Sequence, residues 1–323
     1  AFSILPELQP PVFQMPSWQS AIFSRMNRMS RPRAGVGDPT DVEELRRQFN
    51  YLATRFAAVP KDAVFEAGQL GPVKGEWVRV DGSAPHRVIL YFHGGGYISG
   101  SPETHRTLVA RLCSAASANG FSVNYRLAPD FAFPAGLRDG IDAYRHLLQH
   151  GVSASQVVLA GDGSGGGLVF ACLLAIRNAG LEMPAAVVAM SPWADLSLSG
   201  WSMLQNAKKD AALSWELLFM SARNYLKKQS PADPYASPIY APFRDFPPIM
   251  VHAGSNEILR DDASRIGDRA AEAGIPVSVE IYDGMQHLFQ ASAYVPEARV
   301  SLQRLGQFIR QRVPDTLAKA AAG

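Results

Sequence analysis

A short apolar run that ends in a glycine-rich turn constrains the fold of this chain more than any other stretch. Residues 157–160 (VVLA) are apolar and bounded by glycine, which is typical of a fully buried strand. Residues 168–177, behind the turn, are apolar and helix-forming. A sharp turn between a strand and a helix is the setting of a nucleophile elbow, G-x-S-x-G. Both frame glycines are present, but Gly163 stands where the serine belongs and Ser164 follows it.

Buried strands alternate with helices along most of the chain. The strand patterns lie at 76–80, 87–92, 121–125, 157–160, 185–190, 249–252 and 277–282, and the helical patterns at 103–118, 135–149, 168–179, 261–273 and 296–312. This alternation predicts an α/β fold in which helices cover both faces of a parallel sheet. Ligands bind such sheets beyond the carboxyl ends of the strands.

Two stretches interrupt this rhythm. Residues 1–60 are helical in character, and residues 196–245 hold many large apolar side chains with few strand signals. We expect helices from both stretches to form a cap over a pocket. The predicted organisation is an N-terminal part of the cap, a first part of the catalytic domain, a cap insertion and a second part of the catalytic domain, at 1–50, 51–195, 196–240 and 241–323.

The composition argues against several function classes. A net charge of +2 over 323 residues is too weak to predict binding to nucleic acid or to an anionic membrane surface. No apolar run is long enough to predict a membrane span. Cys113 and Cys172 lie in apolar helical patterns, which favours small buried hydrophobic residues over a disulfide or a metal site. A reducing, cytoplasmic compartment fits this cysteine usage.

Two motifs bring further reactive groups to the ends of strands. Residues 93–96 (HGGG) follow a predicted strand, and their glycines let backbone N–H groups turn toward a developing oxyanion. A phosphate-binding loop is disfavoured, because neither glycine run matches the known phosphate or dinucleotide patterns. His287 follows the last strand, where a loop histidine can serve as general base.

An acid that could orient this histidine lies after the preceding strand. Glu257 could stabilise the imidazolium of a general base. Asp261 and Asp262 compete with it, but they look like the first turn of the next helix, where acids are favoured by the helix dipole. Asn256 cannot supply the charge. The chain order of elbow, acid and histidine is that of the α/β hydrolases.

Six motifs together resemble the hormone-sensitive-lipase family of esterases, the bacterial family IV. They are HGGG at 93–96, YRLAP at 125–129, FPA at 133–135, GDxxGG at 161–166, SPWxDL at 191–196 and DGMxH at 283–287. The resemblance implies an α/β-hydrolase fold with an eight-stranded, mostly parallel sheet flanked by helices and covered by a helical cap. It also implies a small-molecule ester substrate of short to medium acyl chain, no cofactor or metal, and a homodimer through the last strand.

The resemblance also assigns roles to individual residues. The N–H groups of Gly94 and Gly95 would donate to the oxyanion, with that of Ser164 as the third donor. His287 would be the base and Glu257 the acid, at a position where the family more often has aspartate.

The family pattern at the elbow, GDSxGG, puts its serine on Gly163, and three explanations compete. The first is an active esterase whose serine was replaced to obtain an inert protein; we favour it because every other catalytic position is retained. The second is a natural, non-catalytic module that binds small molecules on a hydrolase scaffold. The third, which we favour least, makes Ser164 a shifted nucleophile.

Large apolar side chains from the expected cap and from the loops near the motifs are candidates for lining a substrate pocket, since such pockets are mostly apolar. Roughly half of them are expected to be ordinary core residues instead. The candidates are Trp18, Phe23, Tyr97, Met203, Leu204, Trp215, Phe219 and Phe289.

Overall fold

An eight-stranded sheet, in the order β1-β2-β4-β3-β5-β6-β7-β8, forms the centre of the fold. The strands from β4 across to β8 are all parallel, and β1 and β2 are antiparallel to their neighbours. The predicted, mostly parallel sheet is therefore confirmed. The strands are β1 (Ala63–Leu70), β2 (Val73–Val80), β3 (Ala84–Phe92), β4 (Ala118–Val123), β5 (Val157–Asp162), β6 (Ala186–Met190), β7 (Ile249–Gly254) and β8 (Val277–Tyr282).

The structure, a computed structural model, describes residues 16–30, 40–55 and 58–315. Parts of the expected N-terminal cap, at 1–15 and 31–39, therefore lie outside the described residues. The helices are α1 (Trp18–Ser30), α2 (Thr40–Arg55), α3 (Pro102–Ala116), α4 (Ala135–Gln149), α5 (Gly163–Asn178), α6 (Ser202–Gln205), α7 (Trp215–Leu226), α8 (Arg260–Glu272) and α9 (Pro296–Arg312). Short 3₁₀ turns lie at Ala154–Gln156, Pro238–Tyr240 and Phe289–Ala291.

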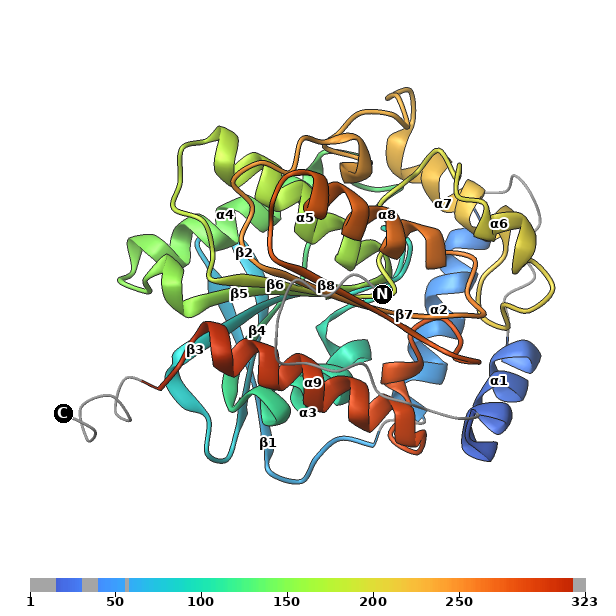
Figure 1. Cartoon of the computed structure of the whole chain (residues 1–323), viewed down its shortest axis with the longest axis horizontal. Coiled ribbons are helices and arrows are strands. Elements are labelled where there is room, and N and C mark those ends of the chain that lie inside the picture. The colour runs from blue at the N-terminus through green and yellow to red at the C-terminus, as the bar shows by residue number, and fades with distance from the viewer. Residues whose placement is uncertain (1–15, 31–39, 56–57, 316–323) are drawn as a thin grey trace.

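Helices cover both faces of the sheet, as Figure 1 shows, with α4, α5 and α8 on one face and α3 and α9 on the other. Alternate residues of each strand enter the two cores, because strand side chains point to opposite faces in turn. Leu159 of β5 packs toward α5, whereas its neighbour Val158 belongs to the core beneath α3 and α9. Burying a side chain of this size stabilises the fold by about 1.5–3 kcal/mol.

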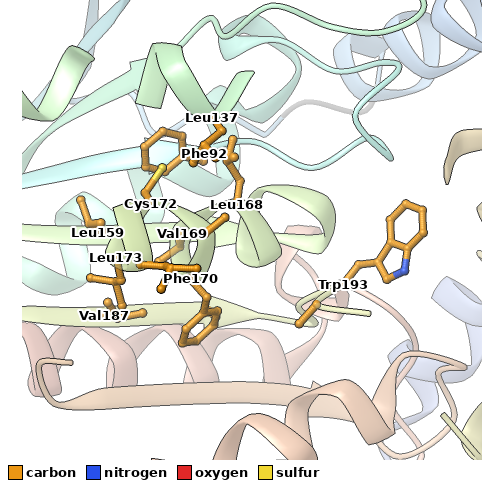
Figure 2. Packing of buried hydrophobic residues seen from close by; sticks show 14 of the residues in the cluster. Phe92, Leu137, Leu159, Leu168, Val169, Phe170, Cys172, Leu173, Val187 and Trp193 are labelled. Atoms are coloured by element: carbon orange, nitrogen blue, oxygen red, sulfur yellow. The ribbon is translucent and has the colours of Figure 1, made fainter. Parts of the chain in front are cut away.

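Helix α5 is the central helix of the larger core. Its residues from Gly163 to Ile176 are all buried, which is typical of a helix that is apolar on every side. Figure 2 shows how its side chains meet those of the sheet and of α4. The residues in contact there include Phe92, Leu137, Leu159, Leu168, Val169, Phe170, Cys172, Leu173 and Val187.

Glycines let the first turn of α5 touch neighbouring backbone directly. A Cβ at Gly165 would lie 2.1 Å from the carbonyl oxygen of Phe92, the last residue of β3. A Cβ at Gly167 would lie 1.9 Å from the carbonyl oxygen of Trp193, in the loop after β6. No side chain fits at either position, so the turn is wedged between two strand ends.

Hydrogen bonds hold the segment before α1 to α9 and hold α2 to the loop after β3. Ser17, just before α1, donates through its N–H and hydroxyl to the carboxylate of Glu297 on α9, at 2.7 and 2.8 Å. Arg46 on α2 donates to the carbonyl oxygen of Ile98, in the loop after β3, at 2.7 Å. The insertion between β6 and β7 contributes α6 and α7. Figure 1 shows α1, α2, α6 and α7 gathered at one end of the molecule.

Two differences from the sequence expectations exceed small shifts of the element ends. Strand β1 was not predicted, because its exposed and intermediate positions carry only a weak apolar pattern. Helix α5 begins at Gly163, before the expected 168, because tertiary contacts overcome the low helix propensity of its glycines. The expectation for the cysteines is confirmed, since Cys113 and Cys172 are both buried free thiols. Among the described residues, no helix has the length and apolar character needed to cross a membrane.

The wedge at the start of α5 predicts two very different costs for adding a methyl group. Gly165→Ala should lower the free energy of unfolding by more than about 3 kcal/mol, because the clashing atoms are backbone and cannot rotate away. Gly180→Ala, at a φ of +66° with nothing within 4 Å, should cost only about 1–2 kcal/mol. Urea denaturation of both variants measures the difference, and equal losses would contradict the wedge.

Candidate active site

The reactive groups named from the sequence meet at one edge of the sheet. The HGGG loop follows β3, Gly163 follows β5, Glu257 follows β7 and His287 follows β8. These strands are parallel, so their carboxyl ends lie on the same side, where α/β folds place their ligands.

Gly163 faces the imidazole of His287. It has a φ of +50°, in the left-handed region that glycine adopts at little cost. A Cβ built on it would lie 3.6 Å from His287 Nε2 and 3.7 Å from the Cα of Gly94. Both are ordinary van der Waals distances, so a side chain at this position would point at the histidine without a clash.

Glu257 holds the other nitrogen of the same ring. Its Oε2 lies 2.7 Å from His287 Nδ1, and its Oε1 accepts the N–H of Gly254 at 2.6 Å. The carboxylate is fully buried, while 13% of the histidine side chain is exposed. This pairing fixes the tautomer that leaves Nε2 as an acceptor on the Gly163 side.

The surroundings of His287 favour its protonated form. Burial by itself lowers the pKa of this histidine, but the hydrogen bond and charge of Glu257 oppose it. The charges of Asp210 and Asp162 act in the same direction, and the net effect raises the pKa above its ordinary value. The ring is thereby suited to taking up a proton.

The competing acids and amide bind elsewhere. Asp261 accepts the N–H of Ser202 at 2.8 Å, and Asp262 accepts the N–H groups of Ala194 and Asp195 at 2.8 and 3.0 Å. Asn256 donates to a backbone carbonyl of the loop after β8. Of the four candidates for the acid, Glu257 is the one whose carboxylate meets His287.

One of the two glycine N–H groups in the HGGG loop that were expected to donate to the oxyanion is already engaged. The N–H of Gly94 already donates to Oδ1 of Asp162, at 3.1 Å, and is therefore not free for an oxyanion. Gly95 and Gly96 have φ of +119° and +66°, so their N–H groups take directions that only glycine adopts readily. Within the described ranges, the N–H groups of Gly95, Gly96 and Ser164 donate to no protein acceptor.

The hydroxyl of Ser164 is engaged away from the histidine. Its Oγ accepts the N–H of Tyr97 at 3.2 Å, and the side chain is buried. This geometry ties the start of α5 to the loop after β3 and opposes the hypothesis of a shifted nucleophile.

Asp162, directly before Gly163, is the buried support of the elbow. Its Oδ1 accepts the phenol of Tyr91 at 2.6 Å as well as the N–H of Gly94, and its Oδ2 lies 3.5 Å from His105 Nε2. Burial raises the pKa of this carboxyl, but His105 and Tyr91 lower it more, so the net pKa is below the ordinary value. A negative charge therefore stays fixed behind the elbow and holds the HGGG loop in place.

Ser191, Asp210 and Gln286 connect the site and were not singled out from the sequence. The hydroxyl of Ser191 donates to Glu257 and accepts the N–H of Leu288, at 3.0 and 3.1 Å. Asp210 accepts the N–H after Glu257 at 2.8 Å, and Gln286 accepts the N–H after Asp210 at 2.8 Å. Ser191 is the first residue of the SPWxDL motif, which could have pointed to it. No sequence signal points to Asp210 or Gln286.

Three of the eight expected pocket residues are buried. Tyr97 stacks on Tyr225 with ring centroids 4.0 Å apart, and Met203 lies in the larger core. Phe289 belongs to a small cluster next to the His287 loop, and half-buried Phe23 of α1 packs against that cluster. These contacts are those of packed side chains.

The other pocket candidates lie nearer the surface. Trp18 and Leu204 are largely exposed. Trp215 is exposed and stacks on half-buried Phe219, one turn away on α7, with ring centroids 4.8 Å apart. Contact of these residues with a substrate stays a prediction.

Comparison with known proteins agrees with this geometry. A family model described as the alpha/beta hydrolase fold matches residues 89–291, from β3 to the turn after His287. The chain belongs to the α/β-hydrolase family. An acetyl-hydrolase of Streptomyces hygroscopicus is 39% identical over 242 residues, which cover 75% of this chain and 81% of that protein. An esterase of Acinetobacter venetianus is 35% identical, covering 74% of this chain and 80% of its own length.

A solved structure extends the match to the fold of this α/β hydrolase. The crystal structure of an esterase from the bacterial hormone-sensitive-lipase family superposes with a TM-score of 0.88 at 35% identity. The superposition covers 93% of this chain and 99% of the esterase chain. The resemblance read from the six motifs is thereby confirmed, as is the α/β-hydrolase fold that it implied.

The contact between Glu257 and His287 predicts a change in titration. Glu257→Gln should lower the pKa of His287, since the charge of Glu257 then no longer opposes the effect of burial. Asp261→Asn removes a nearby carboxylate that binds Ser202 and should leave this pKa in place. NMR titration of the ring measures both, and a histidine that responds to Asp261→Asn but not to Glu257→Gln would contradict the pairing.

The raised pKa of His287 also predicts how the stability of the fold depends on pH. A histidine whose pKa is higher in the folded state than in the unfolded state stabilises the fold at pH values below its unfolded pKa of about 6.5. This contribution is lost as the pH rises through the pKa of the folded state. The gap in free energy of unfolding between the parent and Glu257→Gln should therefore narrow with rising pH across that window.

Proposed function

We propose that this chain is built as a carboxylic ester hydrolase for short- to medium-chain esters, and that Gly163 leaves it without its nucleophile. The observation that carries this proposal is the direction of the missing side chain. A Cβ at Gly163 points at His287 Nε2 from 3.6 Å, while Glu257 holds Nδ1 of the same ring at 2.7 Å. A serine hydroxyl there would lie within hydrogen-bond reach of the base.

With serine at position 163, the reaction runs through an acyl-enzyme. The hydroxyl proton passes to His287 Nε2 as the oxygen attacks the ester carbonyl, and Glu257 stabilises the imidazolium. The N–H groups of Gly95, Gly96 and Ser164 serve as donors to the oxyanion, often the largest single term in such catalysis. The protonated histidine then gives its proton to the leaving alkoxide, and water releases the acid by the reverse steps.

The names of the relatives support an ester as substrate. Two proteins that match about three quarters of this chain are called an acetyl-hydrolase and an esterase. An acetyl or other short acyl group therefore fits the proposal, and the reaction itself needs no cofactor.

A second function has one observation in its favour, which is Gly163 itself. A protein that keeps the acid, the base and the free N–H donors but lacks the attacking oxygen could bind small molecules without turning them over. The two hypotheses differ in one respect. Placing serine at position 163 has a catalytic effect under the esterase hypothesis and none under the binding-module hypothesis.

We expect Gly163→Ser to raise the rate of p-nitrophenyl acetate and butyrate hydrolysis by roughly 10⁶, the scale on which loss of such a nucleophile acts. The variant should be less stable by about 1–3 kcal/mol, because a residue with a Cβ is strained at a φ of +50°. Hydrolysis rates and melting temperatures measure these effects.

Ser164→Ala in the parent chain is the matched control and should leave the hydrolysis rate nearly unchanged, because the proposed role of Ser164 uses its backbone N–H. The variant should melt at a lower temperature, since the N–H of Tyr97 loses its acceptor. An inert Gly163→Ser variant would favour the binding module. A competent parent enzyme that Ser164→Ala abolishes would make Ser164 the nucleophile.

A further inference from the structure

We propose that the chain with Gly163 transfers the acyl group of an ester directly to a small external nucleophile, either water or a short primary alcohol, which takes the place of a serine hydroxyl beside His287. The inference rests on the proposed function, since it uses the same ester site. It adds a different reaction course, a single displacement without an acyl-enzyme, and a class of second substrate.

The first step is that Gly163 differs from the glycines around it. A Cβ at Gly94, Gly161 or Gly165 would come within 2.5 Å of a neighbouring atom, so packing forbids a side chain there. At Gly163 the nearest atom, Nε2 of His287, would be 3.6 Å away. The space beyond Gly163 therefore admits a carbon atom, and it is bounded on one side by a base.

The second step is the state of that base. His287 Nδ1 is paired with Glu257 at 2.7 Å, so neutral imidazole presents the lone pair of Nε2 toward Gly163. Within the described part of the chain, Nε2 accepts no hydrogen bond from a protein donor. A water or alcohol O–H can donate a hydrogen bond to this nitrogen.

The third step is the balance of the reaction. The alcohol O–H gives its proton to His287 Nε2 while its oxygen forms a bond to the ester carbonyl carbon. The C=O electron pair moves onto the carbonyl oxygen, toward the N–H groups of Gly95 and Gly96. When the pair returns, the bond to the leaving oxygen breaks and that alkoxide takes the proton from His287. An alcohol yields a new ester, water yields the acid, and nothing is oxidised or reduced.

The fourth step is a bound on rate. General-base assistance contributes roughly 10²–10⁴-fold over reaction in solution. An external nucleophile lacks the effective molarity of an attached one, which reaches roughly 10⁵–10⁸ M. Turnover should therefore lie well above the uncatalysed reaction and far below that of Gly163→Ser.

The experiment follows methanolysis of p-nitrophenyl butyrate by the parent chain, with methyl butyrate as the measured product. The parent should form methyl butyrate at least about ten-fold faster than Gly163→Ala, because the added methyl group occupies the nucleophile's space and general-base assistance is then lost. The alanine variant bears the same backbone strain as Gly163→Ser but has no hydroxyl. Equal rates for the parent and Gly163→Ala would overturn the proposal.

A second measurement on the parent alone covers the case in which Gly163→Ala does not fold. At equal concentrations, the yield of new ester relative to the uncatalysed reaction should fall from methanol to ethanol to 2-propanol, since the space is small. The rate should also rise with pH as His287 loses its proton. A yield that is unchanged across the alcohols, or a rate indifferent to this titration, would contradict the inference.

Gly163→Ser, assayed in parallel, separates the two proposals. An active Gly163→Ser variant beside a parent that makes no methyl ester above the uncatalysed rate would refute the direct transfer alone. An inert Gly163→Ser variant would refute the esterase function on which it rests.

Discussion

The contact that the rest of the site depends on is backbone against backbone. The first turn of α5 touches the end of β3 at Gly165 and the loop after β6 at Gly167, with no room for a side chain at either point. This contact fixes how far Gly163 stands from the HGGG loop and from His287. Misplacement of reacting groups by about 1 Å can cost a reaction roughly 10²-fold.

A second set of hydrogen bonds positions His287 and Glu257 relative to that elbow. Ser191, at the end of β6, bridges Glu257 and the N–H after His287, so three neighbouring strand ends share one hydroxyl. Asp210, from the insertion between β6 and β7, binds the backbone beside Glu257. The insertion is thus part of the support of the site, and its charge also helps to raise the pKa of His287.

Much of this arrangement could be predicted from the sequence, because the signals are local. The buried run of β5, the glycines after it and the order of Glu257 and His287 lie in short stretches that follow strands. The role of Gly94 could not be predicted, since the hydrogen bond that occupies its N–H comes from Asp162, 68 positions away. The roles of Asp210 and Gln286 could not be predicted for the same reason, since their partners are distant in the sequence. Strand β1 was not predicted because an exposed edge strand has little apolar pattern.

The central claim is that position 163, and not Ser164, is where the nucleophile of this scaffold stands. It is tested most directly by treating the parent and Gly163→Ser with diethyl p-nitrophenyl phosphate and locating the label by peptide mass spectrometry. The account predicts one diethylphosphoryl group on residue 163 of the variant and none on the parent. A label on Ser164 of the parent chain, lost with Ser164→Ala, would contradict it.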